Sequence, residues 1–345
     1  LRVAAMVLNI KKNDEVIICT HTFWNTVVPF LEFGAKFKII DTKKNSLSID
    51  EKILKKNITK KTKAVIIWGH GGMSQRSDII YKICKKKKIP LIDDCAHSLG
   101  SYFKKKHAGY YSDIATFSFS TQKNITTLGE GGMFVTNDLL LAKKARGFKL
   151  CFPVGDFKKM RINKFNNYLK PKRTFFMRPG QAYEGEFTNI DKVGTNYKMT
   201  NVQAAVGISQ LTRIKKILYK RRKIASIYDN FISNNRNLFE KFVEEKNSIN
   251  CFHLYSVRIK KNKYFTRNEL ISFFLDKYKI ELRNRFFPIN YNPAIKKRLV
   301  KKIQTPYFDK IWFEEMISFP IASSMSLIQA KNFITCLKKF IVSKT

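Results

Sequence analysis

Short apolar runs of strand length alternate with helix-like stretches through the first half of this sequence. The runs are "EVIIC" (15–19), "FKIID" (37–41), "AVIIW" (64–68), "PLIDD" (90–94), "ATFSFS" (115–120) and "GMFVTN" (132–137). Between two of them, "SDIIYKICKKKK" (77–88) carries apolar residues at helical spacing on one face. This repetition predicts an α/β fold with a mostly parallel central sheet and helices on both faces.

The second half of the sequence has a different organisation. Residues 147–195 combine Phe, Lys, Pro and Gly without clear periodicity, which favours an excursion over the surface or across a subunit interface. Residues 200–231 then read as one long helix, whose start carries a capping box formed by Thr200 and Gln203.

A strand at 251–259 and a helix at 266–278 follow that long helix. We therefore expect a large ligand-binding domain over residues 1–230 and a smaller C-terminal α+β domain over residues 231–345.

The net charge of +40 arises from 66 Lys and Arg against 26 Asp and Glu. Lys residues are spread along the whole chain, and no recognition-helix, zinc-finger or RNP-type pattern accompanies them. The charge therefore favours a solvated basic surface that attracts anionic substrates over specific nucleic-acid binding. Clustering of the Lys residues on one face would support nucleic-acid binding instead.

The six Cys are scattered without a CxxC motif, which favours reduced thiols over a disulfide framework or a metal site. No apolar run approaches the roughly 18 residues of a membrane span, and the first residues do not resemble a signal peptide. These features predict a cytoplasmic protein with no metal and no membrane partner.

The stretch "LIDDCAHSLGS" (91–101) ends an apolar strand on two adjacent carboxylates, Asp93 and Asp94. The next predicted strand ends near Ser118 and Lys123, and a glycine-rich turn leads into the following one. In sheets of this kind ligands bind at the carboxyl ends of the strands.

An acid, a Lys, hydroxyl groups and a flexible turn at one sheet edge suit pyridoxal phosphate (PLP). That cofactor needs a Lys amine for a Schiff base with its aldehyde and a carboxylate that keeps its pyridine nitrogen protonated. Hydroxyl and backbone N–H groups must also hold its phosphate.

The sequence resembles the DegT/StrS sugar aminotransferases, and among them the perosamine-synthase-like members. Five blocks carry the resemblance: "DEVIICTHTFWNTV" (14–27), "LIDDCAHSLGS" (91–101), "FSFSTQKN" (117–124), "GEGGMFVTND" (129–138) and "GTNYKMTNVQAAVGISQL" (194–211). These relatives are PLP enzymes of fold type I, the aspartate aminotransferase fold, and they mostly aminate keto groups on nucleotide-linked sugars. The resemblance implies the same fold and activity for this chain.

The resemblance also implies residue roles. Lys123 would bind the cofactor as a Schiff base and move a proton, and Asp94 would pair with the pyridine nitrogen. Four further residues would contact the cofactor: Trp24 by stacking on its ring, His97 near its phenolic oxygen, Ser118 at its phosphate and Asn196 at the phosphate in the partner subunit. The active unit would then be a homodimer.

The substrates implied are glutamate as amino donor and a keto-sugar as acceptor, in the biosynthesis of amino sugars for polysaccharides or glycoconjugates. Because Lys123 is present, transamination is favoured over the dehydration catalysed by relatives with His in its place. Arg283, in "KIELRNRFFPINYNP" (279–293), is a candidate contact for a substrate diphosphate or carboxylate.

Family members begin earlier than this chain, with a Ser-Gly-Thr turn that holds the cofactor phosphate. Residues 1–10, "LRVAAMVLNI", correspond to the helix just after that turn. We therefore regard the N-terminal segment as missing and expect these 345 residues to bind PLP poorly.

Two alternative functions stay open at this point. One is an aminotransferase acting on a keto-inositol, and the other is a non-catalytic sensor or binding protein on the same scaffold. Retention of both Lys123 and Asp94 favours an enzyme.

Overall fold

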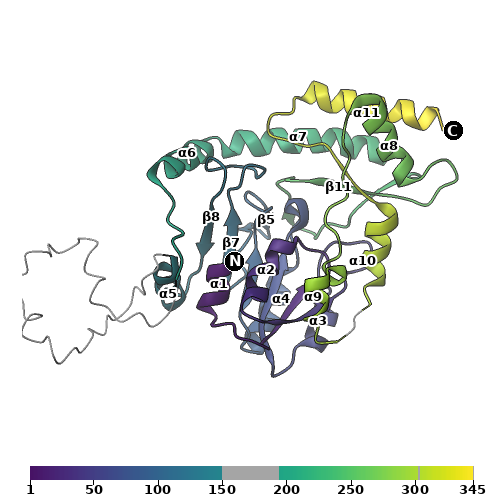
Figure 1. The fold of residues 1–345 in the computed structure, drawn as a ribbon. Helices are drawn as coiled ribbons and strands as arrows, with labels where there is room; N and C mark the ends of the chain where they lie inside the picture. Colours follow the sequence, from purple (N-terminus) through teal and green to yellow (C-terminus); the bar gives the residue numbers. More distant parts are fainter. Residues whose placement is uncertain (150–193, 302–303, 345) are drawn as a thin grey trace, which may run out of the picture.

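The computed structural model describes residues 1–149, 194–301 and 304–344. Its centre is a six-stranded sheet with the order β2-β1-β3-β4-β7-β8 (Figure 1). The strands are β1 (Glu15–Cys19), β2 (Lys36–Ile40), β3 (Thr62–Trp68), β4 (Leu91–Asp94), β7 (Ile114–Ser118) and β8 (Gly132–Val135). Only the β7–β8 pairing in this sheet is antiparallel, so the predicted mostly parallel sheet is confirmed.

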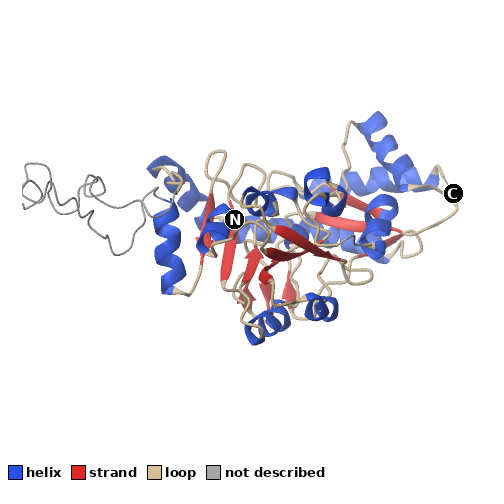
Figure 2. Cartoon of the chain, turned by 60° about the horizontal axis from the view of Figure 1, so that its bottom comes forward, coloured by secondary structure: helices blue, strands red, loops and turns tan. Residues whose placement is uncertain are grey.

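Helices cover both faces of this sheet (Figure 2). On one face lie α1 (Arg2–Val7) and α2 (Val28–Glu32), and on the other lie α3 (Glu51–Asn57) and α4 (Ser77–Lys86). Val16 and Ile18 join the first apolar cluster and Ile17 joins the second, because successive strand residues point to opposite faces. Helix α5 (Leu139–Lys149) packs against α1.

The predicted single helix over 200–231 is two helices, α6 (Asn201–Thr212) and α7 (Ile214–Ser233), so that prediction was wrong in part. At Arg213, with φ −97° and ψ 0°, the regular helical hydrogen bonding is interrupted, because its N–H bonds to the carbonyls of Gln210 and Leu211. No Gly or Pro marks this break in the sequence. The predicted capping box of Thr200 and Gln203 is present.

Helix α7 leads into a second lobe (Figure 1), which is built on a three-stranded antiparallel sheet. Its strands are β9 (Phe239–Lys241), β11 (Tyr255–Ile259) and β12 (Met316–Phe319), and α7, α8 (Arg267–Tyr278) and α11 (Leu327–Val342) enclose its core. Because α7 crosses residue 230 and joins this core from Ile224, the domain boundary drawn there stays a prediction.

The predicted strand at 251–259 begins four residues later than expected, at Tyr255. Phe252 has a positive φ of 50°, and its N–H donates to the side chain of Asn250. This local turn replaces the first part of the strand.

Short elements complete the fold. They are β5 (Tyr102–Phe103), β6 (Lys106–His107) and β10 (Ser248–Ile249), which form a third sheet, together with α9 (Pro293–Lys296) and α10 (Pro306–Lys310).

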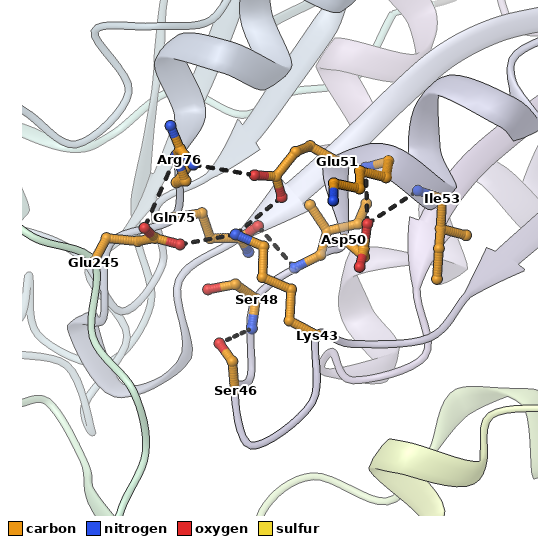
Figure 3. Close-up of polar contacts among 11 residues, drawn as sticks. Lys43, Ser46, Ser48, Asp50, Glu51, Ile53, Gln75, Arg76 and Glu245 are labelled. Carbon is orange, nitrogen blue, oxygen red and sulfur yellow. Dashed lines mark hydrogen bonds and ion pairs between the residues drawn. The ribbon is translucent and has the colours of Figure 1, made fainter.

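A cluster of ion pairs ties the segment between β9 and β10 to the first lobe (Figure 3). Lys43 Nζ lies 2.9 Å from a carboxylate oxygen of Glu51 and 2.9 Å from one of Glu245. Arg76 lies within 4.0 Å of the same two carboxylates. Each charge in the cluster has an opposite partner, so we regard it as structural.

Of the 147–195 stretch, residues 150–193 lie outside the described residues. In the part of the chain that is described, every helix is too short or too polar to cross a lipid bilayer.

Candidate active site

Loops that follow four parallel strands supply side chains to one edge of the central sheet. His21 follows β1, His70 follows β3, His97 follows β4 and Lys123 follows β7, while Asp94 is the last residue of β4. Because the carboxyl ends of parallel strands share one edge of a sheet, these five residues lie in the same region.

Four of the five histidines of the sequence form a chain of ring contacts at this edge. The ring centroids lie 4.6 Å apart for His21 and His70, 6.5 Å for His70 and His97, and 4.1 Å for His97 and His253. Each of the four is at most 5% exposed. His253 comes from the second lobe, so the two lobes meet at this cluster.

Burial keeps these imidazoles neutral. It lowers the pKa of His21 to about 3, and it lowers the pKa of His70, His97 and His253 well below the ordinary value. His97 Nδ1 accepts a hydrogen bond from the backbone N–H of Gly71 at 3.3 Å. Within residues 1–149, 194–301 and 304–344, no group of three or more His, Cys, Asp or Glu is placed to hold a metal ion.

The Asp94 carboxylate is buried and fixed by two hydrogen bonds. Thr26 Oγ1 donates to Oδ2 at 2.7 Å, and the backbone N–H of Ala96 donates to Oδ1 at 3.1 Å. Asp93 points to the other side of the strand, where it accepts from the N–H of Gly109 at 3.0 Å. Burial raises the pKa of Asp93 to about 7. Strand alternation thus separates two adjacent acids into two environments.

The amine of Lys123 is partly buried beside Asp94. Burial lowers the pKa of Lys123, and the Asp94 carboxylate acts in the opposite direction, so the two groups are close enough to interact. Among the described residues, Lys123 Nζ has no hydrogen-bond or ion-pair partner. An amine that makes no hydrogen bond or ion pair, next to a carboxylate held in place, is available for reaction with a ligand.

The other residues predicted to contact a cofactor occupy varied positions. Ser118 ends β7 and its Oγ accepts from the N–H of Ser120 at 3.4 Å, while Asn196 is exposed before α6. Trp24 is 51% exposed and its ring lies 5.2 Å from that of Phe23. The roles of Ser118, Asn196 and Trp24 stay predictions.

The predicted substrate contact, Arg283, is exposed and paired with Glu281. Two residues later Arg285 is partly buried and faces the histidine cluster, since its backbone oxygen accepts from His21 Nε2 at 3.4 Å. The role of Arg283 stays a prediction.

Sequence reasoning missed several of the residues that line this edge. His21 and His70 each come two residues after an apolar strand, so the strand-end rule that identified Asp94 could have identified them. His253 and Arg285 carry no local signal, because only tertiary folding brings the second lobe to the sheet.

Comparison with known proteins assigns the chain to a family. The model of the DegT/DnrJ/EryC1/StrS aminotransferase family matches residues 1–338. GDP-perosamine synthase of Escherichia coli O157:H7 is 31% identical over 305 residues, which cover 87% of this chain and 73% of the relative. UDP-4-amino-4,6-dideoxy-N-acetyl-beta-L-altrosamine transaminase of Campylobacter jejuni is 31% identical over 335 residues, 96% of this chain and 80% of the relative.

A solved structure of a relative has the same fold as this chain. The aminotransferase PseC of Helicobacter pylori superposes with a TM-score of 0.79 at 25% identity, covering 99% of this chain and 85% of that one. The predicted fold class and the predicted class of enzyme, a sugar aminotransferase, are therefore confirmed. The chain belongs to the DegT/DnrJ/EryC1/StrS aminotransferase family.

Proposed function

We propose that this enzyme uses PLP to transfer an amino group from glutamate to the keto group of a nucleotide-linked sugar. The observation that carries the proposal is the uncommitted amine of Lys123 beside the fixed carboxylate of Asp94. Relatives that act on GDP- and UDP-linked sugars support the choice of acceptor. The cytoplasm is the proposed location.

The residues present fit PLP. Asp94, held by Thr26 and the N–H of Ala96, would pair with the pyridine nitrogen, and Lys123 would bind the aldehyde. His97 lies against this site, while Ser118 and Asn196 are the proposed phosphate contacts. When bound, the cofactor supplies an electron sink for the bond that breaks at the substrate carbon.

The chain itself contributes proton transfer, orientation and exclusion of water. Burial lowers the pKa of Lys123, which favours the neutral amine that a proton acceptor requires. The aromatic rings of Trp68 and Phe286, 5.6 Å apart, flank His97 at 5.0 Å and 5.8 Å. Apolar rings on this side of the site would limit access of water, and electrostatic interactions are stronger where water is excluded.

A homodimer is part of the proposal, and an exposed apolar face supports it. Met133 and Val135 on β8 are 52% and 40% exposed, and Val202 and Ile208 on α6 are each 65% exposed. A hydrogen bond joins α6 to the turn before β8. Exposed apolar side chains gathered on neighbouring elements are a feature of protein interfaces. Asn196 is exposed and lies just before α6. A residue that contacts the cofactor of the partner subunit must lie at the dimer interface, and this position is consistent with that role.

The test is an amination assay of the full-length protein with glutamate and a panel of keto-sugar nucleotides and keto-inositols. We expect amine transfer to a sugar nucleotide, the absorbance band of bound cofactor, and sedimentation as a dimer. Lys123→Ala should abolish the band and lower the rate by at least about 10²- to 10⁴-fold, the usual contribution of a positioned acid–base group.

Lys301→Ala, at an exposed lysine, is the control and should keep full activity. Turnover of a keto-inositol alone would favour the alternative acceptor. Cofactor binding without any transfer would contradict the proposal and favour a sensor on this scaffold.

A further inference from the structure

Exposed lysines gather at the amino ends of the central strands, opposite the candidate active site. They lie in the loops before β1, β3 and β4, at the first position of β2, and in the last turns of α3 and α4. Parallel strands all begin at the same edge of a sheet, and each helix that joins two of them ends there, so these positions share one edge. The lysines of this basic edge are Lys11, Lys12, Lys36, Lys55, Lys56, Lys60, Lys61, Lys86, Lys87 and Lys88.

The opposite edge carries far fewer lysines. The loops after β1, β3 and β4, residues 20–27, 69–76 and 95–101, contain none. The loop after β2 holds Lys43, which is paired, and Lys44, and the loop after β7 holds Lys123. Lysines that look evenly scattered in the sequence are therefore brought together at one edge by the parallel topology.

The charges of the basic edge are uncompensated. In the part of the chain that the structure describes, none of these lysine side chains forms an ion pair. Nearby carboxylates have other contacts: Glu15 and Asp113 are each paired with another lysine, and Asp14 accepts from the backbone N–H of Lys11 at 2.9 Å. Like charges this dense create a positive potential that attracts an anionic partner.

The chemistry of this edge favours a lipid bilayer over nucleic acid as that partner. Its loops, residues 8–14, 33–36, 58–61 and 87–90, contain no arginine, the residue that reads phosphates and bases through paired hydrogen bonds. They also present no exposed aromatic ring on which a base could stack.

Two exposed leucines lie at the same edge. Leu139 and Leu140, at the start of α5, are 82% and 59% exposed. Thr136, just before them, donates to the backbone carbonyl of Asp113 at 2.7 Å, which fixes the start of α5 beside the amino end of β7. Apolar side chains next to lysines suit the interface of an anionic bilayer, whereas a phosphate backbone gives leucine nothing to bury against.

We propose that the basic edge docks this enzyme on the surface of an anionic lipid bilayer. Its lysines attract the phosphates of lipid head groups, and Leu139 and Leu140 enter the interfacial region. Because the candidate active site lies at the opposite edge, docking leaves Lys123 accessible to substrates. A surface contact needs no membrane-spanning helix, so it would correct the expectation of no membrane partner that followed from the lack of a spanning run.

The test measures co-sedimentation of the full-length protein with vesicles of phosphatidylglycerol and phosphatidylcholine in equal parts. Wild type should bind these vesicles, and should bind vesicles of phosphatidylcholine alone much more weakly. The test variant carries Lys60→Gln, Lys61→Gln, Lys87→Gln and Lys88→Gln. It should bind roughly 10²-fold more weakly, because each lysine near an anionic surface adds to the attraction.

A matched variant removes the same charge from the second lobe. It carries Lys261→Gln, Lys331→Gln, Lys338→Gln and Lys339→Gln, all at exposed lysines. Its affinity should change by less than about threefold, since salt screens charges far from the docked surface. Equal losses in both variants would mean that net charge alone attracts the vesicles, which overturns the assignment.

Two further measurements complete the test. The pair Leu139→Ala and Leu140→Ala should weaken binding to vesicles, and binding to duplex DNA of random sequence should be weaker than binding to vesicles at equal phosphate concentration. Absence of binding to anionic vesicles, or tighter binding to the DNA, overturns the proposal. Amine transfer without vesicles should be equal in all variants, so the outcome does not depend on the proposed function. Circular dichroism checks that each variant is folded.

Discussion

Glu15 and Lys38, toward the amino ends of the central strands, are more deeply buried than Lys123 and Arg285 of the candidate active site, yet their charges are paired. Lys38 Nζ lies 3.2 Å from Glu15 Oε2 and donates to the carbonyl of Asn57 at 2.9 Å. At the carboxyl ends, Lys123 and Arg285 have no such partner among the described residues. The same types of side chain therefore stabilise the fold at one end of the sheet and stay available to ligands at the other.

Breaking the paired end should have the largest effect on stability. Lys38→Met leaves the Glu15 carboxylate buried without its cation, and we expect the free energy of unfolding to fall by about 3–5 kcal/mol. Amine transfer by the folded fraction should be unchanged, because the pair lies away from Lys123. Urea unfolding followed by circular dichroism measures the loss.

The matched control for that change is Lys36→Met, at an exposed lysine on the same strand. Its effect on the free energy of unfolding should stay within about 0.5 kcal/mol. If Lys38→Met and Lys36→Met lose the same free energy of unfolding, the ion pair of Glu15 and Lys38 does not stabilise the fold more than an exposed lysine does.

A smaller effect, on activity, is expected at the carboxyl end. Thr26→Val removes the 2.7 Å hydrogen bond to Asp94 and keeps the side-chain shape. A hydrogen bond to a charged group contributes about 1.5–3 kcal/mol, so kcat/KM should fall roughly 10- to 100-fold. Thr26→Ser should recover most of that activity, as steady-state kinetics would reveal; equal losses in both variants would exclude a positioning role for the hydroxyl.

The smallest expected effect is a pH dependence of stability that arises from the histidine cluster. The pKa of His21 is about 3 in the folded protein, against about 6.5 when unfolded, so the unfolded state binds the extra proton as the pH falls. The stability that His21 contributes is therefore present above pH 6.5 and declines toward pH 3. Between pH 7 and pH 5 the decline should be about 2 kcal/mol.

His21→Phe should remove the contribution of His21 to the pH dependence of the free energy of unfolding, as measured by urea unfolding at several pH values. The ring of His21 stacks on Phe308 at 4.4 Å, and Phe keeps this contact. His107→Phe, at the histidine outside the cluster, controls for loss of an imidazole elsewhere. A slope for His21→Phe equal to that of wild type would mean that His21 is not held neutral.

The sequence by itself determined the architecture and indicated which two residues, Asp94 and Lys123, we propose as the reacting pair. Alternating strands and helices fix a mostly parallel sheet, and that topology alone places residues after β4 and β7 at one edge. Asp94 and Lys123 could therefore be assigned to one site from their positions in the chain, together with the motifs of the family.

Tertiary structure decided what those local patterns do not encode. The break between α6 and α7 at Arg213 has no Gly or Pro that would predict it. The 51% exposure of the Trp24 side chain depends on how the loop after β1 packs against the rest of the fold. His253 and Arg285 reach the site only because the second lobe packs against the sheet. Arg283 and Arg285 have identical side chains, and long-range packing alone leaves the first exposed and paired and places the second, unpaired, beside Lys123.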